Sequence, residues 1–184
     1  MSVRKTPQRT PPKKRILVVD DHAVLREGLV AQINREPDLL VCGEAADARA
    51  ALSAAEKLLP DLVLADLTLP GRNGLELIRD LHALCPTLPV LVLSMHDASL
   101  FAERVLRAGG RGYISKQQSG ERLLIAIRRV LAGQIYLSDD VSTQLLDTLS
   151  NQRPAKTLSP VEQLTDRELE VFTMIGQAKE TKTI

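Results

Sequence analysis

Short apolar runs alternate along the chain with longer segments in which apolar residues recur every three or four positions. An uninterrupted run suits a strand covered on both faces of a parallel sheet, whereas the longer spacing is that of an amphipathic helix. Five strand–helix pairs follow one another in this way. The expected strands are 16–19, 39–41, 62–65, 89–93 and 112–115, and the expected helices are 22–35, 47–59, 74–84, 97–108 and 121–131.

This alternation is typical of parallel crossover connections and predicts an α/β fold, a doubly wound (βα)5 sheet. The pattern changes after Gly133, where a helix over 138–149 and a polar linker through Pro160 are expected. Thr165 and Glu168 then have the spacing of a capping box, so a further helix should begin there and end near Gly176.

Composition narrows the class of protein. Hydrophobic residues make up 44% of the chain, but Trp is absent and only two Tyr and two Phe occur, so the core should be aliphatic. The net charge is +1, and six of the 24 basic residues lie in the first fifteen positions, which contain no acid. The remainder is acidic overall, so composition alone does not favour nucleic-acid binding.

The ends of the chain and its cysteines point to a soluble cytoplasmic protein. Residues 1–14 are rich in Pro, Lys and Arg and should form a disordered tail. No apolar run approaches the length of a membrane span, and no segment resembles a signal peptide. Cys42 and Cys85 have no metal-ligand spacing, and we expect both to be reduced thiols in the core.

Polar residues that could bind a ligand or take part in a reaction stand at the carboxyl ends of four of the five expected strands. Parallel strands with right-handed crossovers bring these ends to one edge of the sheet, where open α/β sheets bind ligands. The sequence therefore predicts one site at that edge. Its residues are Asp20 and Asp21 after the first strand, Asp66 after the third, Ser94 after the fourth and Lys116 after the fifth.

The charges at this edge indicate a cation and a phosphoryl group. Carboxylates about 4 Å apart repel by about 4 kcal/mol per pair at an effective dielectric of about 20, so something cationic must offset them. Oxygen ligands suit Mg²⁺, which commonly joins one or two carboxylates to a phosphate. Lys116 adds a positive charge and Ser94 a hydroxyl donor. Asp66 would then be the nucleophile, as in aspartyl-phosphate chemistry.

Residues 15–132 resemble the receiver domain of bacterial two-component response regulators. The segments ILVVDDHAVLREGL, DLVLADLTLPGRNGLEL, VLVLS and GYISK match that family in order, type and spacing. The resemblance implies a flavodoxin-like sheet with strand order 2-1-3-4-5. It also implies that Asp66 is the phosphoacceptor, that Asp21, Asp66 and the backbone carbonyl of Thr68 bind Mg²⁺, and that Asp20 assists through water.

The same resemblance assigns Ser94 and Lys116 to the phosphoryl group. Tyr113 falls where the family has a rotating aromatic switch that works with Ser94, although an ordinary side chain at the sheet edge is the alternative. Gln117 follows the lysine, where many receivers have proline. His22 and His96 flank the site, and we expect neutral surface histidines rather than ligands. His96 and Thr68 nevertheless occupy positions at which the family tunes the lifetime of the phosphoryl group.

The segment from Leu164, LTDRELEVFTMIGQAKETKTI, resembles the start of a LuxR-type helix-turn-helix domain, typical of the NarL/FixJ class of transcription regulators. Ala178 stands where that family usually has glycine. The recognition helix would have to follow Ile184, so we expect DNA binding by a full-length domain and not by this chain as given. The expected organisation is a tail (1–14), a receiver (15–132), a helical linker (133–163) and an incomplete helix-turn-helix domain (164–184).

The expected function is to accept a phosphoryl group from a sensor histidine kinase and thereby to control dimerisation and transcription. Such a protein catalyses only its own phosphorylation and dephosphorylation. Two alternatives stay open, a phosphorylation-independent interaction module and a Mg²⁺-dependent phosphohydrolase. A haloacid-dehalogenase-type hydrolase needs an acid two residues after its first-strand nucleophile, and His22 stands there instead.

Overall fold

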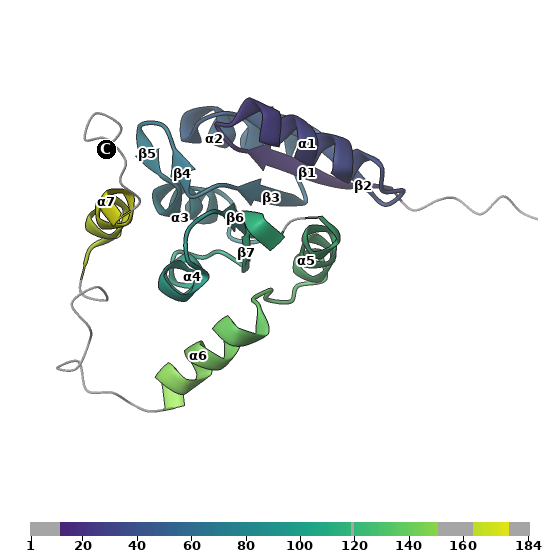
Figure 1. Cartoon of the computed structure of the whole chain (residues 1–184). Helices are drawn as coiled ribbons and strands as arrows, with labels where there is room; N and C mark the ends of the chain where they lie inside the picture. The colour runs from purple at the N-terminus through teal and green to yellow at the C-terminus, as the bar shows by residue number, and fades with distance from the viewer. Residues whose placement is uncertain (1–11, 119, 151–163, 177–184) are drawn as a thin grey trace, which may run out of the picture.

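The computed structural model describes residues 12–118, 120–150 and 164–176, and its elements are drawn in Figure 1. Five parallel strands form the main sheet in the order β2-β1-β3-β6-β7. These strands are β1 (Lys14–Val19), β2 (Leu39–Ala45), β3 (Leu62–Ala65), β6 (Val90–Ser94) and β7 (Gly112–Ser115). The helices are α1 (Ala23–Asn34), α2 (Ala48–Leu58), α3 (Gly74–Leu84), α4 (Ala98–Arg107), α5 (Glu121–Leu131), α6 (Asp139–Ser150) and α7 (Asp166–Gly176), with a 3-10 turn η1 at Lys116–Gln118.

Helices cover both faces of the sheet, as the unbroken apolar runs predict. Alternate residues of each strand point to opposite sides, so β1 sends Leu17 and Val19 to one core and Ile16 and Val18 to the other. Helices α2, α3 and α4 pack on the first side, and α1 and α5 pack on the second. Counted among the sheet strands alone, the order is 2-1-3-4-5, and the doubly wound fold is confirmed.

A small antiparallel hairpin stands where the sequence pattern indicates only a loop. It is formed by β4 (Thr68–Leu69) and β5 (Arg72–Asn73) and directly follows Asp66. Pro70 and Gly71 make its turn, and Gly71 has a φ of 78°, which a glycine adopts without strain. Two residues per strand are too few to show an alternating pattern, so the hairpin had no signal beyond its turn residues.

The helix ends largely follow the expected capping chemistry. The Asp97 carboxylate accepts a hydrogen bond from the Ser99 N–H at 2.8 Å and begins α4. At α7, Thr165 Oγ1 accepts from the Glu168 N–H at 3.3 Å, and Glu168 Oε2 accepts from the Thr165 N–H at 2.8 Å. The predicted capping box is therefore confirmed, and it fixes where α7 begins.

Two neighbouring strands, β1 and the edge strand β2, are longer than their apolar runs. β1 begins at Lys14, inside the expected tail, because Asp61 accepts hydrogen bonds from the Lys14 side chain and the Arg15 N–H. β2 extends to Ala45 and is only partly buried, as an edge strand is. Both additions are polar or mixed stretches whose pairing depends on the neighbouring strand rather than on apolar content.

Two helices beyond the (βα)5 unit pack against it. A backbone bridge joins Tyr136 to Gly112, and buried Val141 brings α6 onto the core beside α4. α7 buries Leu169 against the same core, whereas Phe172 and Ile175 further along the helix are exposed. Most of the expected basic tail, linker residues 151–163 and everything after Gly176, including Ala178, lie outside the described residues.

Two smaller expectations concern cysteines and membranes. Cys42 and Cys85 are both free thiols, although each is only half-buried rather than in the core. Across the part of the chain that the structure describes, none of the helices has the length and apolar character that crossing a membrane requires.

Candidate functional site

The carboxyl ends of the strands bring the expected residues together. Asp20 and Asp66 follow the adjacent strands β1 and β3, and the Asp66 N–H donates to the Val19 carbonyl at 2.9 Å. Ser94 is the last residue of β6, and Lys116 follows β7. The sheet thus fixes the backbone beneath each side chain, which gives the site a rigid base.

Lys116 is the cation of the site. Its Nζ lies 2.7 Å from Asp66 Oδ2 and 2.8 Å from Asp20 Oδ2, and all three side chains are almost fully buried. Burial alone would lower the pKa of Lys116, but the two carboxylates outweigh it and raise the pKa. The lysine therefore stays charged and joins the first and third strands to the fifth.

The second oxygen of Asp66 is the most unusual atom in the site. Oδ1 is buried and has no hydrogen-bond partner, although Oδ2 is paired with Lys116. Burial raises the pKa of Asp66, and Asp20 adds to the rise, while Lys116 and the backbone of Thr68 only partly oppose it. A buried unpaired carboxylate oxygen costs free energy, so its retention indicates a functional role.

Four side chains around Asp66 form a group with the donor set of a metal site. Ligand atoms of Asp20, Asp21, His22 and Asp66 all lie within 4.8 Å of one another. The three carboxylates match the preference of Mg²⁺ for oxygen, and the orphaned Asp66 oxygen would gain a partner, so the residues fit the expected ion. That the Thr68 backbone carbonyl is a further ligand of this ion stays a prediction.

The two histidines beside the site differ from each other. His22 is exposed as expected, but its Nδ1 lies 2.7 Å from Asp21 Oδ1 and so joins the acidic group. The prediction of a surface position is wrong for His96, which is buried and stacks on Phe101 with ring centroids 4.7 Å apart. Adjacency to Asp21 was the available signal for His22, whereas nothing in the sequence pattern indicated that the His96 ring stacks on Phe101.

A chain of contacts connects the loop after Asp66 to helix α4. His96 Nε2 lies 3.0 Å from Thr68 Oγ1, and the His96 N–H donates to Ser94 Oγ at 3.3 Å. The Tyr113 hydroxyl donates to the His96 carbonyl at 2.7 Å. Tyr113, on the edge strand β7, is buried, which raises the pKa of its hydroxyl, and its role as a switch stays a prediction.

Gly74 allows α3 to begin close beneath the loop that follows Asp66. A Cβ at this position would lie 2.5 Å from the Leu67 Cα and 2.7 Å from the Asp66 carbonyl oxygen, both backbone atoms that cannot move aside easily. The Gly74 N–H donates to the Leu67 carbonyl at 2.8 Å. A glycine is therefore required for this close approach.

Comparison with known proteins agrees with this geometry. Residues 16–128 match the model of the response regulator receiver domain. The chain is 35% identical over 170 residues to the response regulator GacA of Pseudomonas aeruginosa, covering 92% of this chain and 78% of GacA. It is 36% identical over 174 residues to the oxygen regulatory protein NreC of Staphylococcus aureus, with coverages of 92% and 80%.

A solved structure extends the similarity to three dimensions. The crystal structure of a LuxR-family two-component response regulator from Aurantimonas sp. SI85-9A1 superposes with a TM-score of 0.70 at 36% identity. The match covers 75% of this chain and 99% of that one.

Proposed function

Because the chain belongs to the response regulator receiver family, with relatives in the NarL/FixJ class, we propose that Asp66 accepts a phosphoryl group from a sensor histidine kinase in a Mg²⁺-dependent reaction. The buried, unpartnered Oδ1 of Asp66 is the observation that carries this proposal. It is a nucleophile that the protein leaves without a hydrogen bond. Its partner oxygen is meanwhile held by Lys116.

In the proposed step, Asp66 Oδ1 attacks the phosphorus of a phosphohistidine. A P–O bond forms as the P–N bond breaks, and the departing imidazole nitrogen keeps the bonding electron pair and takes a proton. Lys116, already 2.7 Å from Asp66, neutralises charge on the transferred group, and Ser94 offers its hydroxyl to a phosphoryl oxygen. Positioning and charge neutralisation supply most of the catalysis in phosphoryl transfer.

Mg²⁺ would be held by Asp21 and Asp66 and by the Thr68 carbonyl, and Asp20 would assist through water. When bound, it would offset carboxylate repulsion and the charge of the transferred group. The dense acidic group supports this assignment, since Lys116 alone cannot neutralise three carboxylates.

The output proposed for this chemistry is control of dimerisation and transcription. A phosphoryl group that draws the Ser94 hydroxyl away from the His96 N–H would disturb the segment that leads into α4. Tyr113, bonded to the same His96, would respond with it and act as the switch. The family is not one of metabolic enzymes, and the chain would catalyse only its own phosphorylation and dephosphorylation.

Intact-mass spectrometry tests the proposal. With Mg²⁺ and acetyl phosphate the protein should gain the mass of one phosphoryl group, and EDTA should prevent the gain. Asp66→Asn should not gain it, whereas Asp80→Asn, which removes an exposed carboxylate on α3, should behave as the wild type. Equal gains by Asp66→Asn and wild type would refute the proposal.

A further inference from the structure

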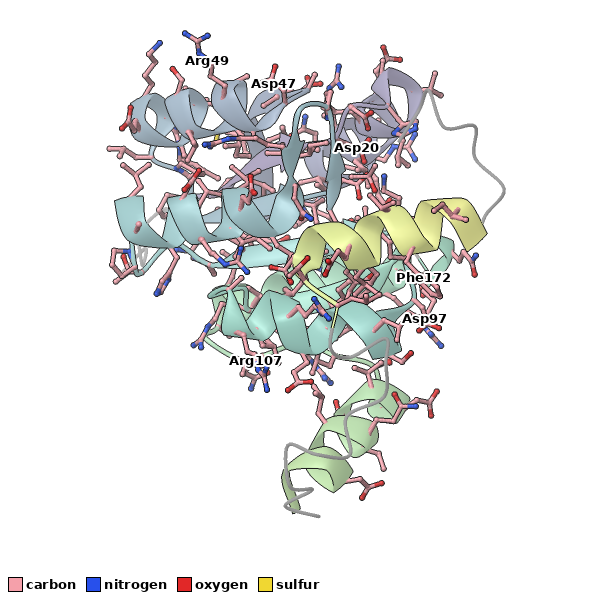
Figure 2. All side chains as sticks on the ribbon, turned by 90° about the vertical axis from the view of Figure 1, so that its left-hand side faces the viewer. Asp20, Asp47, Arg49, Asp97, Arg107 and Phe172 are labelled. Carbon is pink, nitrogen blue, oxygen red and sulfur yellow. The ribbon has the colours of Figure 1, made fainter. Side chains whose placement is uncertain are left out.

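Helix α7 presents the Asp166 carboxylate to the (βα)5 unit. Thr165 and Glu168 satisfy each other in the capping box, so Asp166, the first residue of the helix, is not needed as a cap. Its side chain points instead toward α3, which lies to the left of α7 in Figure 2, and toward α4, which lies below it. The capping box thus fixes where α7 begins, and Asp166 connects this end of the helix to α3 and α4.

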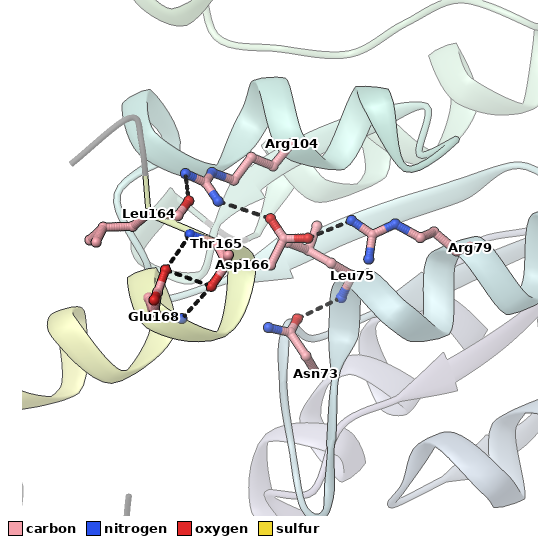
Figure 3. Close-up of polar contacts among 8 residues, drawn as sticks. All are labelled: Asn73, Leu75, Arg79, Arg104, Leu164, Thr165, Asp166 and Glu168. Atoms are coloured by element: carbon pink, nitrogen blue, oxygen red, sulfur yellow. Dashed lines mark hydrogen bonds and ion pairs between the residues drawn. The ribbon is translucent and has the colours of Figure 1, made fainter. Parts of the chain in front are cut away.

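Two arginines from different helices hold this carboxylate. Arg79 of α3 pairs with Asp166 Oδ2, and Arg104 of α4 pairs with Asp166 Oδ1 at 2.9 Å, as Figure 3 shows. Arg104 also donates to the Leu164 carbonyl at 2.7 Å. Asp166 therefore bridges α3 and α4. Arg104 binds both the Asp166 carboxylate and the Leu164 carbonyl, two residues apart in the chain.

This contact is more than an exposed ion pair. The side chains of Arg104 and Asp166 are 17% and 25% exposed, and Leu169, one turn further along α7, is 1% exposed in the main core. Burial would raise the pKa of Asp166, yet the two arginines lower it. Apolar burial and charge pairing thus act at the same end of α7, while its far end exposes Phe172 and Ile175.

We propose that the face made by α3 and α4 is a docking surface for α7 of the same chain, and that Asp166, shared between Arg79 and Arg104, is the residue that fixes its position. The surface selects a helix with an acid at its first position and a leucine three residues later. The short connection from the end of α6 at Ser150 keeps this partner at high effective concentration. Any other protein that uses this face must displace α7.

Hydrogen exchange of the full chain, measured by mass spectrometry without phosphodonor, tests the docking surface. Amides of 166–176 should be protected in the wild type. In Asp166→Asn they should exchange about ten- to hundredfold faster, the effect of losing a hydrogen bond to a charged group. Glu168→Gln is the matched control, because it also removes one acid from the first turn but keeps a capping-box residue and touches neither arginine.

A double-mutant cycle and a dilution series complete the test. Arg79→Gln should also speed exchange of α7, and its effect should largely vanish when Asp166→Asn is already present. Protection should not change with protein concentration. Equal effects of Asp166→Asn and Glu168→Gln, additive effects of Arg79→Gln and Asp166→Asn, or protection that rises with concentration would overturn the proposal, the last by showing docking between copies. Each readout is independent of phosphorylation.

Discussion

Replacing Asp66 by asparagine should stabilise the metal-free protein against unfolding. The substitution keeps the size of the side chain and removes one negative charge from a site where Lys116 pairs with the buried carboxylates of Asp20 and Asp66 and the exposed Asp21 lies close by. Most substitutions of buried, ion-paired residues destabilise a fold. The opposite sign here would follow from a site shaped for a cation and a phosphoryl group rather than for stability.

The magnitude follows from the distances. At an effective dielectric of about 20, attraction between Lys116 and Asp66 at 2.7 Å is about 6 kcal/mol. Ligand atoms of Asp20 and Asp21 lie within 4.8 Å of Asp66, so each repels it by at least about 3.5 kcal/mol. The two effects nearly cancel, and the cost of burying the Asp66 charge decides the sign. We expect Asp66→Asn to be more stable by about 1–3 kcal/mol, or about 2–4 °C per kcal/mol in Tm.

Urea unfolding in EDTA at neutral pH would measure this difference, with Asp80→Asn as the control. Because the pKa of Asp66 is raised in the folded state, its ionisation costs stability. The advantage of the variant should therefore be small below the unfolded-state pKa of about 4 and grow as pH rises through the folded pKa. Added Mg²⁺ should narrow the gap by stabilising the wild type more. A variant less stable than wild type in EDTA would show that the Lys116 pair dominates and refute the reasoning.

Three further predictions follow from the same contacts. Lys116→Gln leaves Asp20 and Asp66 buried without a cation and should cost about 3–5 kcal/mol in urea unfolding without metal, a loss that Asp66→Asn should largely rescue. Gly74→Ala forces its Cβ against backbone and should cost about 1–3 kcal/mol and slow phosphorylation; an unchanged urea midpoint would contradict the close approach. Phosphorylation should speed hydrogen exchange in α7, because movement of α4 separates Arg104 from α3; protection that persists in fully phosphorylated protein would exclude this coupling.

The arrangement of the sheet was readable from the sequence because each strand is buried on both faces. Leu62 to Ala65 has no polar interruption, and parallel connections then place Asp66 at the same edge as Asp20 and Lys116. The convergence of the site is a consequence of topology, so residues more than ninety positions apart could be assigned to it before any distance was known.

Features that depend on contacts between different elements could not be predicted from the sequence. His96 is buried, stacks on Phe101 and contacts Thr68, and the pattern of residues around it gives no sign of these contacts. The apolar positions of α7 indicate a buried stripe but not that Leu169 is buried while Phe172 and Ile175 are exposed. Arg79 and Arg104 look like ordinary surface positions of two amphipathic helices until Asp166 reaches both.

Mapping the phosphoryl group to a single residue tests the central claim most directly. The protein would be incubated with Mg²⁺ and acetyl phosphate, reduced with borohydride to trap an acyl phosphate, digested and sequenced by mass spectrometry. Reduction should convert one aspartate to homoserine, at Asp66 and at no other acidic residue. A trapped residue at Asp20 or Asp21, or a stable phosphoryl group on Ser94 or His22, would contradict the assignment of Asp66 as the phosphoacceptor.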